Sequence, residues 1–141
     1  MRMSCVVYNA INHYTSADVS AGEYVIPKGT IVIPSIMNVL LDPDYFVNPH
    51  EFNPDRFLST NGEFKPDEHV IPFSIGKRYC LGKSLAEKEY FLFFTGIMSQ
   101  FDVNPAPNQP LPSYHLKDYF SATIVRTPPS FKLVLTSRWE G

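Results

Sequence analysis

The first part of the chain consists of short β-prone runs separated by turn residues. Runs rich in valine, isoleucine and tyrosine predict three short strands, at residues 5–8, 23–26 and 30–33. Pro27-Lys28-Gly29 separates the last two runs as a turn. Pro34 has no N–H to donate, so it should end the third strand or lie on a sheet edge. We expect one or two helical turns over residues 36–41.

The middle of the chain, residues 42–79, sustains neither helical nor strand periodicity. Prolines interrupt it at Pro43, Pro49, Pro54, Pro66 and Pro72. Irregular stretches longer than about 15 residues are uncommon in compact domains unless they serve a function or a partner surface. A merely tolerated surface loop is the alternative interpretation.

The strongest helix signal runs from residue 81 to about residue 101. Lys83 lies four residues before Glu87, which allows an ion pair along the helix. Residues 90–94 are apolar on every side, so the pattern predicts that the second half of the helix is deeply buried.

The remaining residues predict a linker and a C-terminal β-hairpin. Four prolines lie between residues 104 and 113, which favours a linker. Apolar runs at residues 122–125 and 131–135 flank Pro128-Pro129 and predict two strands. Short strands near both ends and one long helix place the chain in the α+β class.

Composition narrows the class of protein. With 141 residues, 44% of them hydrophobic and 14% aromatic, the chain can bury one modest core, so one domain or part of one is expected. Twelve Lys and Arg against fourteen Asp and Glu exclude the basic excess of a nucleic-acid binder. Thirteen prolines with only seven glycines indicate a loop-rich folded chain. The longest apolar run is too short to span a membrane, and no targeting signal is readable.

Cysteine usage points to one site. Cys5 and Cys80 lie far apart, which disfavours a disulfide framework or a cysteine-rich zinc site. Cys80 lies in a glycine-punctuated loop, residues 73–82, that leads into the long helix. Backbone N–H groups at the helix start and the charge of Arg78 favour a thiolate there. Gly76 permits an unusual backbone angle, and Gly82 leaves room for a flat group.

The residues alone leave three interpretations of Cys80 open. A small buried hydrophobe would need neither the glycines nor the charge. A nucleophile would need a histidine base, and the sequence places none of the four candidates beside it: His13, His50, His69 and His115. As a metal ligand, Cys80 would stand alone. A zinc site needs several protein ligands, whereas one thiolate is enough for a haem iron.

The cysteine loop resembles the haem-binding signature of the cytochromes P450, Phe-x-x-Gly-x-Arg-x-Cys-x-Gly. The chain matches every fixed position of that signature, at Phe73, Gly76, Arg78, Cys80 and Gly82. Residues 52–57 are similar to the Pro-Glu-Arg-Phe element of the family's meander, with Asp55 in place of Glu. Residues 22–30 and 42–46 resemble the microsomal family-2 branch.

This resemblance implies a partial cytochrome P450 fold: short strands, a long meander, the cysteine loop, one long helix and a C-terminal hairpin. Residues 1–141 would form a single C-terminal portion of the domain, without the amino-terminal part, its membrane anchor and the central helix. The intact parent would lie on the cytoplasmic face of the endoplasmic reticulum membrane.

The resemblance also implies roles for individual residues. Cys80 would ligate haem iron, Phe73 would pack beside the sulfur, and Arg78 would hold a haem propionate. His13 aligns with a second propionate contact, while Gly82 and Ala86 would lie against the macrocycle. Ordinary structural roles remain as alternatives: Phe73 as a core aromatic, Arg78 as a solvated surface arginine and His13 as a loop histidine.

The implied reaction is insertion of one atom of O2 into a lipophilic small molecule, as in xenobiotic metabolism, with electrons from an NADPH-dependent cytochrome reductase. Apolar residues would border the substrate pocket, although strand burial explains them equally well: Val6, Val7, Ile11 and Ile124. Lys77, Lys83 and Lys88 are candidates for docking the reductase, or simply a solvated helix face.

The rival hypothesis is a truncated, catalytically inactive fragment that does not bind haem stably. Arg2 resembles the arginine of the family's Glu-x-x-Arg motif, whose glutamate would fall before residue 1. Arg2 and the meander residue Arg56 would then face each other with no anion between them, and residues 90–94 would leave an apolar patch exposed. A cysteine-dependent hydrolase is the weakest alternative, because no base is identifiable.

Overall fold

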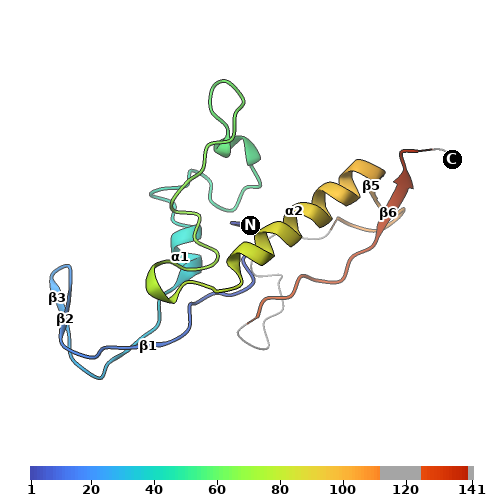
Figure 1. Cartoon of the computed structure of the whole chain (residues 1–141). Helices are drawn as coiled ribbons and strands as arrows, with labels where there is room; N and C mark the ends of the chain where they lie inside the picture. The colour runs from blue at the N-terminus through green and yellow to red at the C-terminus, as the bar shows by residue number, and fades with distance from the viewer. Residues whose placement is uncertain (112–124, 140–141) are drawn as a thin grey trace. The chain divides into compact units, whose positions relative to one another are not determined.

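Short strands precede and follow two α-helices of very different length in the computed structural model (Figure 1). The structure describes residues 1–111 and 125–139. The elements of the first half are β1 (His13–Tyr14), β2 (Val19–Ala21), β3 (Tyr24–Ile26), β4 (Ile31–Val32) and α1 (Ile36–Leu40). Those of the second half are α2 (Lys83–Gln100), β5 (Phe101–Pro105) and β6 (Leu133–Ser137). This mixture confirms the α+β class.

The chain divides into two compact units. The first comprises residues 1–74 and 121–126, and the second comprises residues 75–120 and 127–141. The prediction of a single C-terminal portion of one domain stays a prediction. Among the described residues, no helix is both long enough and apolar enough to cross a membrane.

The strands of the first unit form two small antiparallel pairs. β1 pairs with β4, with His13 opposite Val32. β2 pairs with β3 in a hairpin whose turn contains Gly22 at a φ of 60°, a backbone conformation that glycine adopts without strain. The strands predicted at residues 23–26 and 30–33 are confirmed as β3 and β4, each with a partner other than the neighbouring run.

The strand predicted at residues 5–8 is wrong. Val7 forms only an isolated bridge, to Val125. The Tyr8 carbonyl accepts a hydrogen bond of 3.0 Å from the Met37 backbone N–H in α1, so it is engaged by the helix rather than by a strand ladder. Tertiary contacts therefore override the local β preference of this run.

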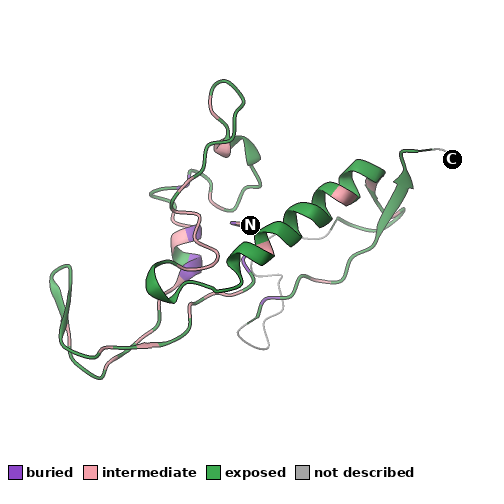
Figure 2. Ribbon diagram, viewed as in Figure 1, coloured by how far each residue is buried: buried purple, intermediate pink, exposed green. Residues whose placement is uncertain are grey.

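The core of the first unit is small and centred on α1, the helical turn that the sequence predicted. Its apolar members are at most 4% exposed, and Leu40 is fully buried (Figure 2): Cys5, Ile36, Met37, Leu40 and Phe46. Arg2 and Arg126 are buried with them, at 4% and 5% exposure. Arg126 Nη1 donates to the Cys5 carbonyl at 2.9 Å, and its guanidinium lies 5.3 Å from the Tyr8 ring centroid.

The long segment between the two helices is irregular, as predicted. Its regular pieces among the described residues are two single 3-10 turns, Pro54–Phe57 and Gly76–Arg78. Asn53 begins the first turn, because its side-chain oxygen accepts the Asp55 backbone N–H at 3.1 Å. Pro54 fits the next position, where no N–H is required.

Helix α2 confirms the predicted long helix but not its predicted burial. The Lys83 and Glu87 side chains lie 4.0 Å apart, as the spacing suggested. Residues 90–94 are between 50% and 70% exposed (Figure 2), although the pattern predicted a buried second half. A helix that is apolar on every face is normally buried on every face by other elements. Among the described elements, α2 packs chiefly against β5, which directly follows it.

Strand β5 pairs antiparallel with β6, and its extent corrects the predicted start of the linker. The linker expected from residue 104 begins later, since β5 includes Asn104 and Pro105. The predicted tail strand at residues 131–135 is observed as β6, but its partner is β5, with Phe101 opposite Ser137. Residues 122–124 of the expected hairpin lie outside the described residues. Arg138 Nε and Asp102 Oδ1, 2.9 Å apart, add an ion pair.

Candidate functional site

The loop before α2 is built from tight backbone turns that end at Cys80. Ser74 and Gly76 both have positive φ angles, 63° and 74°. A 3-10 turn over Gly76–Arg78 is closed by a 3.2 Å bond from the Tyr79 N–H to the Gly76 carbonyl. The Cys80 carbonyl then accepts the Lys83 N–H at 3.2 Å. These bonds fix Cys80 immediately ahead of the first turn of α2.

Basic residues flank Cys80 along the chain. Lys77 and Arg78 lie in the 3-10 turn just before it, and Lys83 begins α2. The first turn of α2 contains no acidic residue and has no side-chain cap. Uncapped N–H groups and the positive end of the helix dipole therefore remain available to an anion.

The side chains around Cys80 also leave its thiol accessible. Cys80 is exposed and forms no disulfide. A Cβ atom built on Gly82 would lie 3.8 Å from the Cys80 sulfur, so glycine leaves that space open. Among the described residues there is no cluster of three or more His, Cys, Asp or Glu that could hold a metal ion. One exposed cysteine with no side chain at Gly82 beside it fits haem iron, which needs a single axial protein ligand.

The structure brings together one set of predicted site residues. Arg78, Cys80, Gly82 and Ala86 lie in the second unit, along the loop and the first turn of α2. The other described site residues lie in the first unit: Val6, Val7, Ile11, His13 and Phe73. Ile124 lies outside the described residues. Val6 and Ile11 are 55% and 87% exposed, so strand burial does not account for them in this chain.

Arg2 lies in the position that the resemblance suggested, close to Arg56. Its Nη1 and Nη2 donate to the Leu40 and Pro49 carbonyls at 2.6 and 2.8 Å. Burial lowers the pKa of Arg2, and the positive charge of Arg56 lowers it further. No carboxylate of the described residues forms an ion pair with either arginine. The predicted pair of cations without an anion is thus present in this part of the chain.

Sequence analysis did not single out Arg126 or the contacts around Asp67. Arg126 is buried, and the only sequence signal for this burial is the apolar run that precedes it. Tyr45 Oη donates to Asp67 Oδ1 at 3.1 Å across 22 residues of irregular chain. No periodic pattern marks such a contact, so the sequence carried no signal for it.

Comparison with known proteins decides the family. The family model described as Cytochrome P450 matches residues 1–135. The chain belongs to this family. It is 46% identical over 141 residues to Cytochrome P450 18a1 of Drosophila melanogaster, covering all of this chain and 26% of that relative. It is 42% identical over 124 residues to Cytochrome P450 2A8 of Mesocricetus auratus, covering 88% of this chain and 24% of the relative.

The predicted likeness to the family-2 branch is confirmed by such relatives. Cytochrome P450 2C23 of Rattus norvegicus is a further example, 40% identical over 130 residues, covering 92% of this chain and 26% of that relative. Cytochromes P450 are haem-thiolate monooxygenases, so haem is the cofactor of the family to which the chain belongs. The chain spans about a quarter of the length of these curated relatives.

The two cysteines should differ sharply in reactivity. Cys80 is exposed, whereas Cys5 is 3% exposed and its thiol donates to the Val7 carbonyl at 3.1 Å. We expect iodoacetamide to alkylate Cys80 at least about tenfold faster than Cys5 in native buffer, since Cys5 must wait for local opening. Peptide mass spectrometry over a time course measures both rates. In concentrated urea the difference should vanish, and equal rates in native buffer would contradict the placement of Cys80.

Proposed function

We propose that these residues form the haem-ligating part of a monooxygenase that oxidises a lipophilic small molecule. The observation that carries this proposal is the accessible Cys80 thiol on a positively charged loop, beside the open flank at Gly82. In the proposed reaction, one atom of O2 enters a C–H bond of the substrate and the other leaves as water. Two electrons from an NADPH-dependent reductase and two protons balance the reaction.

Haem, once bound, would supply the activation of O2 that no side chain of this chain can perform. Cys80 would donate its thiolate to the iron, and the start of α2 would stabilise the negative charge on the sulfur. Gly82 and Ala86 would let the flat cofactor approach the first turn of the helix. Arg78 would bind a propionate, for which its charge and planar donors suit it better than lysine.

Residues of the first unit have proposed roles that rest on the family resemblance. Phe73 would shield the sulfur from water, and His13 would donate to a second propionate. The apolar residues Val6, Val7, Ile11 and Ile124 would border the substrate. Val6 and Ile11 are 55% and 87% exposed in this chain, which supports a role for these two in binding an apolar partner.

Electron delivery and location follow the same resemblance. The lysines at positions 77, 83 and 88 are exposed and would dock an acidic reductase surface by charge complementarity. A family-2 likeness favours the cytoplasmic face of the endoplasmic reticulum membrane for a protein of family length.

A chimera tests the haem ligand directly. Residues 1–141 would replace the stretch that they match in Cytochrome P450 18a1. We expect the reduced, carbon-monoxide-bound chimera to show the red-shifted Soret band of thiolate ligation, because Cys80 supplies the sulfur. Cys80→Ser and Cys80→His should lose that band, while Cys5→Ser should keep it. A haem-loaded chimera with the spectrum of a histidine-ligated haem would overturn the proposal.

The alternative function, a catalytically inactive fragment, is favoured by two observations. Residues 90–94 are at least half exposed, and the Arg2–Arg56 pair has no carboxylate partner among the described residues. An exposed apolar helix and a buried unpaired charge both cost free energy. This alternative concerns the 141 residues alone and is compatible with haem ligation in a longer chain.

Haem titration of the 141-residue chain separates the two candidates. We expect weak or substoichiometric uptake, because the described residues provide the cysteine loop but little apolar wall around it. Absorbance and size-exclusion chromatography measure stoichiometry and retention. Tight uptake of one haem per chain, lost in Cys80→Ser and kept in Cys5→Ser, would instead reject the inactive-fragment hypothesis.

A further inference from the structure

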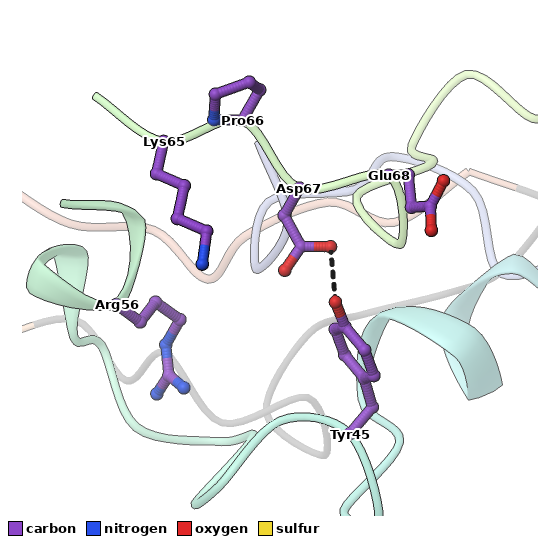
Figure 3. A pocket seen from close by; sticks show the side chains of 6 residues that line it. All are labelled: Tyr45, Arg56, Lys65, Pro66, Asp67 and Glu68. Carbon is purple, nitrogen blue, oxygen red and sulfur yellow. Dashed lines mark hydrogen bonds between the residues drawn. The ribbon is translucent and has the colours of Figure 1, made fainter. Parts of the chain in front are cut away.

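Two hydrogen-bond donors and one imidazole nitrogen of the first unit converge on one carboxylate oxygen, Asp67 Oδ1. The Tyr45 hydroxyl donates to it (Figure 3) over 3.1 Å, and the His69 backbone N–H donates to it over 2.9 Å. The His69 ring adds a contact of 3.3 Å through Nδ1. The Tyr45 and His69 rings also stack, with centroids 3.5 Å apart. An ionised carboxylate is the strongest acceptor for such a set.

This cluster connects the irregular segment to the core. The Tyr45–Asp67 bond spans 22 residues. The Tyr45 ring meets the neighbouring Phe46 ring edge-on at 4.8 Å, and Phe46 is 3% exposed. The Arg2 guanidinium lies 4.8 Å from the Phe46 ring centroid. The contacts at Asp67 thus continue through the Tyr45 and Phe46 rings to the buried side chain of Arg2.

We propose that Tyr45, Asp67 and His69 form a latch that holds the end of the irregular segment to the core at neutral pH and releases it in acid. The segment concerned, residues 66–73, leads along the chain into the cysteine loop. The proposal rests on the geometry of the three side chains and not on the proposed function. Its release in acid follows from protonation of the shared acceptor.

The charged groups around Asp67 fit an ionised carboxylate. Arg56, Lys65 and Glu68 line the same hollow of about 360 Å³ as Tyr45 and Asp67 (Figure 3). Burial raises the pKa of Asp67, but the bonds from the His69 N–H, the Tyr45 hydroxyl and the His69 ring outweigh it and lower the pKa overall. Burial and the Asp67 carboxylate raise the pKa of Tyr45, with a further contribution from Glu68.

The sign of the pH dependence follows from these shifts. A carboxylate whose pKa is lower in the folded state stabilises that state above the unfolded value, about 3.9 for aspartate. The stabilisation is lost as pH falls through the folded pKa. A tyrosine with a raised pKa keeps its contribution until pH rises through its folded value. The latch is therefore closed at neutral pH and opens in acid, as pH falls through the lowered pKa of Asp67.

Amide hydrogen exchange on the whole 141-residue chain tests the latch. Protection factors of peptides covering residues 66–73 would be compared at pH 7 and pH 3, with peptides from α1 as the internal reference. At pH 7 we expect Asp67→Asn to lower protection about tenfold, because neutral acceptors bind more weakly. Tyr45→Phe keeps the stacked ring and should lower protection about threefold. At pH 3 wild type and Asp67→Asn should converge.

Glu68→Gln is the matched control, since it removes an adjacent carboxylate from the same hollow. Its protection at pH 7 should equal that of wild type. The proposal is rejected if Glu68→Gln acts like Asp67→Asn, if Asp67→Asn leaves protection unchanged, or if wild-type residues 66–73 are unprotected at pH 7. If Asp67→Asn also loses protection in α1, this variant is destabilised as a whole. The latch is then tested by the wild-type comparison between pH 7 and pH 3 and by Tyr45→Phe.

Discussion

The proposed haem ligation depends on where the Cys80 sulfur lies relative to helix α2. A 3-10 turn over Gly76–Arg78 and the bond from the Lys83 N–H to the Cys80 carbonyl place the thiol just ahead of α2. Uncapped N–H groups and basic side chains make that position suitable for an anion. Glycine at position 82 keeps the flank of the sulfur open. Local backbone geometry thus places the proposed haem ligand just ahead of α2.

Limited apolar burial is the second constraint. The core of the first unit holds only a few apolar side chains around α1, together with two guanidinium groups. Helix α2 meanwhile exposes its apolar residues, at a cost of about 25 cal/mol for each Å² left in water. The chain spans about a quarter of its curated relatives.

Sequence reasoning succeeded where the determinants are local. The cysteine loop, the long helix and the irregular segment were predictable because glycine positions, helix formers and prolines act on neighbouring residues. It failed where distant residues decide. The partner of β6 among the described residues is β5, and residues 5–8 form only an isolated bridge, with the Tyr8 carbonyl bonded to α1. The contacts of Tyr45 with Asp67 and His69 correspond to no periodic pattern in the sequence, because side chains of irregular segments come together only in the folded chain.

X-ray absorption at the iron edge, on a haem-loaded protein that contains these residues, tests the central claim most directly. The account predicts one sulfur atom in the first coordination shell of iron. That sulfur should disappear in Cys80→Ser and persist in Cys5→Ser, because only the first change removes the exposed thiol before α2. A first shell made only of nitrogen and oxygen in the wild-type protein would contradict the account.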